Sequence, residues 1–340
     1  MSSKYSQFEK RKQDHIDLAL MSCNQTTELN TFDKIMLKHE AIPDLNFDEI
    51  DISSIRLNKL TKTPFIVSSM TAGHQNAINV NQNLMCAAEK SGWAMGVGSQ
   101  RRELTDKNAS LEWKTLREMN PNISLFGNLG ISQLITTKLD DVKRLADALE
   151  ADGLIIHCNP LQESIQPEGT TNFSGSYQAI ENLIKYLSIP VIIKETGCGF
   201  SKTTCNRLVD IGVRVIDVSG LGGTHWGRIE GHRADSKRKI AAETFKNWGI
   251  DTVTSLYNAK QVDSTIEIWG SGGVRNGLDA AKLIAIGASN IGFAKLLLDA
   301  ALKSSELVFE VMQTIEYELK IAMFCTGSKN LSDLKEKLCL

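Results

Sequence analysis

The chain has 340 residues, of which 42% are hydrophobic and 23% are charged, and its formal net charge is −2. This composition supplies a large core and excludes a disordered chain. A general nucleic-acid surface needs a clear basic excess, so we expect small-molecule partners and no nucleic acid. No stretch approaches the ~20 apolar residues that cross a bilayer, and the segment Met1–Lys12 is polar and charged. We therefore expect a cytoplasmic protein with no membrane partner.

The seven cysteines are scattered along the chain and form no C-x-x-C pair. Such a pattern is typical of a protein from a reducing compartment. It also gives no indication of a zinc or iron–sulfur site.

Residues 1–60 precede the first strand pattern and form an arm with little strand character of its own. The arm has a charged start, which contains Arg11 and Lys12. Such a start is usually a solvated tail, so the residues alone assign it no function.

Eight short runs rich in β-branched residues follow, each bounded by Gly, Asn or Ser and separated by longer polar–apolar segments. The predicted strands are Pro64–Met70, Trp93–Ser99, Ile123–Leu129, Gly153–Asn159, Pro190–Thr196, Val213–Ser219, Ile266–Ser271 and Asn290–Lys295. Predicted amphipathic helices between them include Asn76–Ser91, Gln133–Glu150, Tyr177–Leu187 and Asn276–Ile286. Apolar strands that alternate with helices indicate a parallel sheet buried on both faces.

Eight such units favour a closed (β/α)8 TIM barrel, an α/β fold, over the alternative of an open doubly wound sheet. We expect one domain spanning residues 1–340, with the N-terminal arm 1–60. A second irregular region, residues 220–263, lies between the sixth and seventh strands. Long loops in compact domains are usually lids or disordered segments, and this one is predicted to lie as a lid over the C-terminal mouth.

Two glycine loops mark a candidate phosphate site. The seventh strand leads into Gly270-Ser271-Gly272-Gly273-Val274-Arg275, and the eighth ends in Gly292-Phe293-Ala294-Lys295. Barrels that bind phosphate often use the loops after these two strands, where backbone N–H groups face the anion. A single glycine loop would equally be a tight turn, but the two together favour phosphate.

The remaining strand ends are polar, which is typical of a site rather than of a core. They include Ser69, Ser99, Asn128, His157, Lys194 and Ser219. Lys194 emerges from the apolar run Val191–Ile193, so it must face the mouth or be paired. It can stabilise negative charge on a flavin ring, and the alternative is a structural ion pair with Glu195 or Glu163.

Several segments together resemble one enzyme family. They are Arg11-Lys12 with Asp14-His15-Ile16, Ser69-Met70-Thr71, Gly98-Ser99-Gln100-Arg101, His157 with Leu161-Gln162-Glu163, Lys194-Glu195, Gly222-Gly223-Thr224 with Trp226 and Ile229-Glu230, and Ser271-Gly272-Gly273. In this order they resemble type 2 isopentenyl-diphosphate isomerase, which uses FMN and Mg²⁺. The basic pair and the His-x-x-x-x-Gln-Glu block are the most specific parts of the resemblance.

The resemblance implies a role for each matching residue. Residues expected around FMN are Ser69, Met70, Thr71, Ser99, Asn128, Lys194, Thr224, Gly272, Gly273, Ala294 and Lys295, to which the strand-end pattern adds Ser219 and Arg275. The substrate is expected against Arg11, Lys12, Arg101, His157 and Gln162, and Mg²⁺ on Glu163. Trp226 and Glu230 match lid positions, and with Gln162 and His157 they form the candidate catalytic set.

The chemistry expected from these residues is isomerisation of isopentenyl to dimethylallyl diphosphate, a step of isoprenoid biosynthesis. Several cations can donate charge-assisted hydrogen bonds to a diphosphate. The sequence offers no convincing protein acid/base pair, so proton transfer is assigned to reduced FMN, with Gln162 orienting the substrate. NADPH or another reductant would first reduce the flavin. The resemblance also implies a homo-oligomer, a tetramer or an octamer.

Three residues depart from the family pattern, namely Ala72, Cys158 and His225. His225 and Arg228 also have the His-x-x-Arg spacing of FMN-dependent 2-hydroxy-acid oxidases, which are the alternative function. In those enzymes the histidine follows its strand almost at once, whereas here Leu221–Thr224 intervene. A second alternative is a binding scaffold without turnover.

Overall fold

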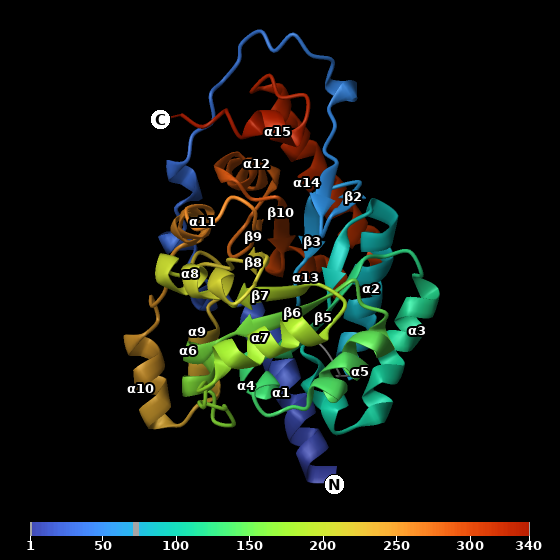
Figure 1. Cartoon of the computed structure of the whole chain (residues 1–340), viewed down its shortest axis with the longest axis vertical. Coiled ribbons are helices and arrows are strands. Elements are labelled where there is room, and N and C mark those ends of the chain that lie inside the picture. Colours follow the sequence, from blue (N-terminus) through green and yellow to red (C-terminus); the bar gives the residue numbers. More distant parts are fainter. Residues whose placement is uncertain (1, 71–74, 340) are drawn as a thin grey trace.

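The computed structural model describes residues 2–70 and 75–339, and at its centre is a closed barrel of eight parallel strands (Figure 1). Strands pair in chain order and the last pairs with the first. They are β3 (Phe65–Val67), β4 (Ala94–Gly96), β5 (Leu125–Gly130), β6 (Gly153–Cys158), β7 (Val191–Glu195), β8 (Val215–Asp217), β9 (Glu267–Gly270) and β10 (Asn290–Phe293). All eight lie within or overlap the predicted runs, so the barrel prediction is confirmed and the open sheet is wrong.

Helices surround the barrel as an outer layer. Those near their predicted positions are α2 (Gln75–Ser91), α7 (Ser176–Tyr186) and α12 (Gly277–Ile286). The others of this layer are α3 (Leu111–Met119), α4 (Ile131–Leu134), α5 (Leu139–Leu149), α6 (Pro160–Ile165), α8 (Lys202–Asp210), α11 (Thr252–Lys260), α13 (Lys295–Ala301), α14 (Ser305–Phe324) and α15 (Leu331–Leu334).

The prediction of one helix over Gln133–Glu150 is wrong, because the segment divides into α4 and α5. The hydroxyls of Thr136 and Thr137 donate to the carbonyl oxygen of Gln133, at 3.3 and 2.7 Å. Threonine hydroxyls that bond to nearby backbone compete with continued helix. Lys138 then adopts an extended backbone (φ −64°, ψ 140°) and starts α5.

Strand alternation sorts the side chains of the barrel. Successive residues face opposite sides of a strand. Ile155 of β6 and Ile192 of β7 pack inside the barrel with Phe126 and Trp269. Two residues further along, on the same side, His157 and Lys194 line cavities at the C-terminal mouth. The strand alternation therefore places polar side chains at the mouth, directly above the apolar layer inside the barrel.

The opposite end of the barrel is closed by the hairpin of β1 (Ser54–Arg56) and β2 (Lys59–Thr61). Arg56 is buried there and donates to the Asn290 side chain and to the carbonyls of Thr63 and Phe65. Burial lowers the pKa of this arginine to about 10. This plug leaves the C-terminal mouth as the accessible end.

Two segments cover the mouth. The arm forms α1 (Ser2–Leu20), which the sequence did not predict as a helix, followed by short 3-10 turns. The segment 220–263 contains α9 (Trp226–Arg233) and α10 (Ser236–Thr244), and its last part forms α11 of the outer layer. The two meet directly, since Thr26 N donates to Gly223 O at 2.8 Å and Gln25 bridges to Thr224. We call α1 with α9 and the turns between residues 21 and 30 the cover.

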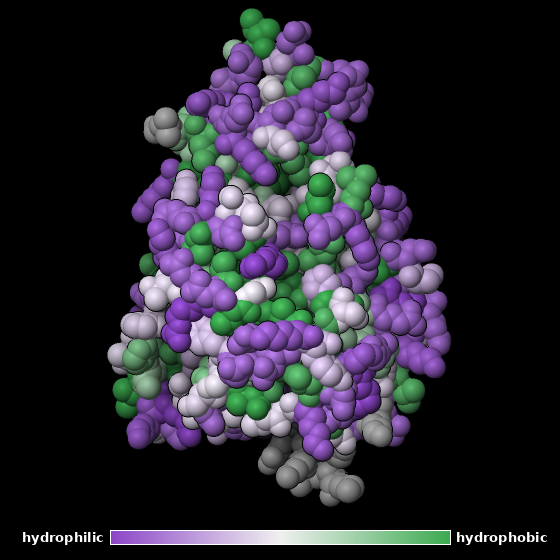
Figure 2. Space-filling view, in the orientation of Figure 1, coloured by the Kyte–Doolittle hydropathy of each residue, from purple (hydrophilic) through white to green (hydrophobic). Residues whose placement is uncertain are grey.

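Within the described residues, no helix combines the length and the apolar character needed to cross a membrane. On the face shown in Figure 2, hydrophilic residues surround separate, smaller apolar patches.

Candidate functional site

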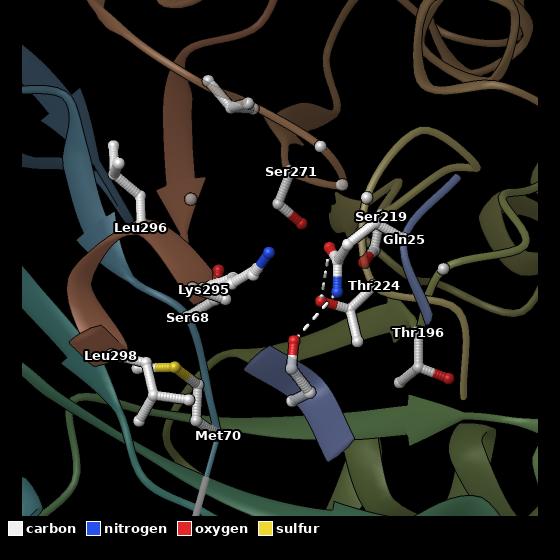
Figure 3. A pocket seen from close by; sticks show the side chains of 18 of the residues that line it. Gln25, Ser68, Met70, Thr196, Ser219, Thr224, Ser271, Lys295, Leu296 and Leu298 are labelled. Atoms are coloured by element: carbon white, nitrogen blue, oxygen red, sulfur yellow. Dashed lines mark hydrogen bonds between the residues drawn. The ribbon is translucent and has the colours of Figure 1, made fainter. Parts of the chain in front are cut away.

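A cavity of about 350 Å³ lies at the mouth, between the ends of β3, β7, β8, β9 and β10 and the cover; Figure 3 shows a pocket with many of these lining side chains. We call it the inner cavity. It collects ten of the residues expected around a cofactor: Ser69, Met70, Lys194, Ser219, Thr224, Gly272, Gly273, Arg275, Ala294 and Lys295. Lys12, His15 and Trp226 of the cover line it as well.

The glycine pair after β9 is required by the packing of two loops. Gly272 and Gly273 have φ angles of +99° and +77°, a region that favours glycine. A Cβ on Gly272 would lie 2.3 Å from Gly220 O, and one on Gly273 would lie 2.2 Å from Gly222 O. Glycine here lets the loop after β8 pack directly on the loop after β9, and together they form one wall of the inner cavity.

Lys194 is held by a buried ion pair. Its Nζ donates to Asp217 Oδ2 at 2.7 Å and to Ser271 Oγ at 2.8 Å. Ser271 in turn donates to Asp217 Oδ1 at 2.5 Å. The alternative weighed from the sequence, an ion pair of Lys194 with Glu195 or Glu163, is wrong, because the partner is Asp217. Glu195 faces the other side of β7, where its carboxylate accepts from Cys198 N and Gly199 N, and burial raises its pKa to about 8.

Arg275 lines the inner cavity, but two carboxylates engage its guanidinium. It donates to Asp279 at 2.7 Å and to Asp33 of the arm at 2.6 Å. These hydrogen bonds raise the pKa of Arg275 further above its usual value. The arrangement weakens the expectation that this charge binds a phosphate, and it gives Arg275 the role of fastening the arm to α12.

A second cavity of about 110 Å³ adjoins the first, and we call it the outer cavity. It collects every residue expected against the substrate or a metal, namely Arg11, Lys12, Arg101, His157, Gln162 and Glu163. Ser69, Met70, Lys194 and Trp226 line both cavities. Ser99 and Asn128, which were expected at the cofactor, line the outer cavity.

The outer cavity is rich in cationic groups, and their burial shows in their pKa values. Burial and the charge of Arg11 lower the pKa of Lys12 to about 7. Burial, with Lys12 and Lys194 nearby, lowers the pKa of His157 to about 4. A cavity that disfavours its own cations gains most from an anionic ligand, because the ligand restores their charge.

Glu163 is the only acid among the described residues that line the outer cavity. It is buried, its Oε2 accepts from Thr170 N at 2.5 Å, and its Oε1 accepts from Asn159 Nδ2 at 3.3 Å. Within residues 2–70 and 75–339, no cluster of three His, Cys, Asp or Glu side chains is placed to hold a metal. Any divalent cation here would therefore share its coordination between Glu163, neutral oxygens and the ligand itself.

Glu230 lies behind the outer cavity and does not line it. The side chain is fully buried and accepts from His15 Nε2 at 2.7 Å, from Arg233 at 2.5 Å and from Gln162 Nε2 at 3.2 Å. Burial would raise its pKa, but His15 and Arg233 outweigh burial and hold the pKa below the usual value. Glu230 thus fixes two lining side chains, one from α1 and one from α6.

Comparisons with known proteins decide the family. The chain is 64% identical over 341 aligned residues to an isopentenyl-diphosphate delta-isomerase of Legionella pneumophila (strain Lens), with all of both chains covered. A relative of the same name from Bdellovibrio bacteriovorus is 50% identical, with 99% of both chains covered. This chain belongs to the isopentenyl-diphosphate delta-isomerase family. Residues 161–340 also match the family model of FMN-dependent dehydrogenases, which confirms the FMN-dependent, type 2 resemblance.

Solved structures similar to this isomerase-family chain show the barrel fold. A flavocytochrome b2 variant with benzoylformate has a TM-score of 0.74 at 18% identity, covering 97% of this chain and 82% of that one. A mandelate oxidase variant with an FMN adduct has a TM-score of 0.65 at 15% identity, covering 95% and 92%. At such identities the likeness concerns the fold alone.

The His-x-x-Arg pair that favoured an oxidase has a structural use in this isomerase-family chain. His225 is buried and caps α9, since its Nδ1 accepts from Arg228 N and its Nε2 donates to Trp248 O. The Arg228 guanidinium donates to the carbonyls of Cys23 and Gln25 in the arm. Neither residue lines the inner or the outer cavity.

Sequence reasoning missed several residues of this isomerase-family site, among them His15, Asp217 and Ser68. His15 lines both cavities, and its spacing of four from Arg11 would place both on one helical face, had the arm been predicted as a helix. Asp217 is an acid within an apolar strand, and the register of β7 with β8 pairs it with Lys194. Ser68 lines the inner cavity beside Ser69 and carried no separate signal. The expected cofactor residue Thr71 and the departure Ala72 lie outside the described residues.

Proposed function

We propose that this protein interconverts isopentenyl diphosphate and dimethylallyl diphosphate with reduced FMN and Mg²⁺. The observation that carries the proposal is the pair of adjoining cavities, both of which are lined by Ser69, Met70, Lys194 and Trp226. One cavity has the glycine loops and strand ends suited to a phosphate-bearing cofactor. The other has the cations suited to a diphosphate.

The inner cavity fits FMN by a test that depends on this chain alone. Ser69 Oγ is buried, has no hydrogen-bond partner among the described residues and lines both cavities. A buried hydroxyl without a partner is costly unless a ligand completes it. Lys194, held by Asp217, would bring positive charge to the flavin ring. Reduced FMN bound there would supply negative charge and an atom able to exchange a proton, with no net redox change.

The outer cavity would bind and orient the substrate. Arg11, Lys12, Arg101 and His157 would contact the diphosphate, and Glu163 would hold Mg²⁺ against it. Gln162 would orient the isoprenoid part, with its amide fixed because Nε2 donates to Glu230 and Oε1 accepts from Asn159. Trp226 would cover the alkene and exclude water. Its ring makes an edge contact with His15, with centroids 5.2 Å apart.

The three functions weighed from the sequence separate in one assay. Purified protein is incubated with isopentenyl diphosphate, Mg²⁺ and FMN, either oxidised or reduced by NADPH. We expect dimethylallyl diphosphate only after reduction, and no consumption of reductant in proportion to product. Reduction of the flavin by a 2-hydroxy acid would establish the oxidase instead, and FMN binding without either reaction would leave a scaffold.

Further proposals concern the whole molecule. We infer one domain in which the arm and the part of the segment 220–263 that precedes α11 act as a lid, because both line or brace the cavities. A cytoplasmic location is supported by seven free cysteines. A homo-oligomer, a tetramer or an octamer, is supported by exposed apolar side chains at Leu278, Tyr317 and Ile321. Analytical ultracentrifugation measures the oligomeric state. We propose NADPH as the reductant of the flavin.

A further inference from the structure

A chain of hydrogen bonds behind the outer cavity involves residues to which the proposed reaction gives no role. Trp113 Nε1 donates to Glu103 Oε1 at 3.1 Å, and Gln100 Nε2 donates to Glu103 Oε2 at 3.1 Å. Gln100 Oε1 accepts from the backbone N–H of Asn128 at 3.1 Å. The Asn128 side chain then contacts His157 Nδ1 at 2.8 Å. Four residues thus connect a helix on the barrel surface to a histidine in the cavity.

The two side-chain amides in this series of hydrogen bonds, those of Asn128 and Gln100, each have one possible orientation. Asn128 Nδ2 donates to Val97 O at 3.0 Å, so its Oδ1 is the atom that faces His157. The reversed amide would set two carbonyl oxygens against each other. Gln100 Nε2 also donates to Leu145 O at 3.2 Å, which fixes its Oε1 toward Asn128 in the same way. An oxygen that faces His157 Nδ1 requires a hydrogen on that nitrogen.

Two glycines leave space for this chain of hydrogen bonds. A Cβ on Gly127 would lie 2.9 Å from Gln100 Oε1, and a Cβ on Gly130 would lie 3.0 Å from His157 Nε2. Gln100 and Glu103 are both buried, at 1% and 4% exposure. Buried polar side chains of this kind are positioned strictly, because a lost partner is not replaced by water.

We propose that Gln100, Glu103 and Trp113 are positioning residues that act through Asn128 to hold His157 as the Nδ1-protonated tautomer, with the lone pair of Nε2 facing the outer cavity. The neutral imidazole has one donor and one acceptor, so fixing Nδ1–H leaves Nε2 as an acceptor. Lys12 and Lys194 are the charged groups whose fields disfavour a second proton on the ring. His15, Arg11, Arg101 and Glu163 line the same cavity.

This inference rests on the proposed function only for its consequence. A fully ionised phosphate oxygen has no hydrogen to offer to a lone pair. Contact between His157 and the diphosphate therefore takes one proton, either on Nε2 or on the phosphate. The diphosphate contact proposed above for His157 therefore includes this proton, and the Gln100 of the Gly98–Arg101 motif gains a role of its own.

The tautomer is tested by nuclear magnetic resonance on the FMN-loaded, oxidised protein labelled with ¹⁵N-histidine. The chain has six histidines, and the His157→Asn variant assigns the relevant signals. At pH 7 we expect a protonated Nδ1 and a bare Nε2 at His157. A protonated Nε2 with a bare Nδ1 would overturn the proposal, and this result does not depend on whether the protein turns over any substrate.

The positioning role is tested by a residue exchange. In Glu103→Gln a single amide oxygen must serve both Gln100 and Trp113, so one donor loses its acceptor. We expect the His157 signals to shift and the KM for isopentenyl diphosphate to rise about tenfold, with a smaller change in kcat. Adding Gln100→Glu lets the new amide at position 103 donate to position 100 and still accept from Trp113, but it sets an oxygen against Leu145 O. The double variant should therefore recover part of both effects.

Trp113→Phe removes only the indole donor and serves as a milder second variant. Glu118→Gln, at an exposed position on the same helix, is the matched control and should change neither readout. Variants that fold and bind FMN but leave the His157 signals and the KM at wild-type values would overturn the positioning role. A KM effect without recovery in the double variant would assign these residues to packing alone.

Discussion

The mouth of the barrel has two parts built in different ways, a wall and a cover. Wall residues such as Lys194 sit on strands, and their positions follow from register and from partners such as Asp217 on the next strand. Cover residues such as Lys12 and Trp226 sit on helices joined by loops, and their positions depend on contacts between the arm and the segment 220–263. Strand register therefore determines the wall, whereas contacts between segments far apart in the sequence determine the cover.

This difference predicts where substitutions act. Changes to the cover should alter binding of the substrate and leave the barrel folded, since α1 and α9 add to a core that is already closed. Changes to the wall should alter stability and cofactor binding together, because the same side chains serve both. Four experiments examine this contrast, beginning with the largest expected effect.

Arg11→Ala combined with Lys12→Ala removes two cations of the cover. Charge-assisted hydrogen bonds contribute about 1.5–3 kcal/mol each, so kcat/KM for isopentenyl diphosphate should fall roughly a thousandfold, mostly through KM. FMN affinity and the unfolding midpoint should stay close to wild type. Lys10→Ala, at an exposed position, is the matched control. If FMN affinity or stability fell as much as substrate binding does, the cover would contribute to cofactor binding and stability as the wall does.

Lys194→Met removes one partner of the buried pair in the wall. The unpaired Asp217 should cost about 3–5 kcal/mol in the free energy of unfolding, measured in urea, and FMN affinity should fall in parallel. Adding Asp217→Asn removes the stranded charge and should restore much of the stability without restoring FMN affinity. A Lys194→Met variant as stable as the wild type would show that the pair contributes nothing to the wall.

Glu163→Gln keeps the shape of the side chain and removes its charge. With Mg²⁺ held by this carboxylate, turnover at limiting Mg²⁺ should fall about a hundredfold while FMN binding is unchanged, because metal affinity depends on ligand charge. Titration of activity against Mg²⁺ measures the effect, and Glu181→Gln on the exposed face of α7 is the control. Unchanged Mg²⁺ dependence together with weaker FMN binding would move Glu163 from the substrate side to the cofactor side.

The smallest effect concerns pH. Burial and Arg11 depress the pKa of Lys12 to about 7, while a bound diphosphate favours its charged form. Above pH 7 the free protein holds Lys12 neutral, so binding must add a proton and the KM should rise with pH, by less than tenfold per unit. Below pH 7 the residue is already charged and adds no slope. Lys12→Arg stays charged, so its KM profile should lack this rise.

The sequence predicted the wall well and the cover incompletely. All eight strands and the ring of polar strand ends were readable, because alternation and glycine boundaries are local signals. The partner of Lys194 was not, since it depends on the register between β7 and β8. The helix α1, the burial of Glu230 behind Gln162 and the capping role of His225 were also missed. Each of these is set by contacts between segments far apart in the chain, for which a single sequence carries no pattern.

The contacts of Arg228 with the arm constrain the order in which parts of the protein can fold during translation. Its guanidinium reaches Cys23 O and Glu28 in the arm as well as Lys246 O, so one side chain joins segments that lie 205 and 18 positions away. During synthesis the arm leaves the ribosome long before this partner exists. These contacts cannot all form until residue 228 and Lys246 have been translated. The Arg228 contacts that hold the arm over the mouth can therefore form only after residue 228 has been translated.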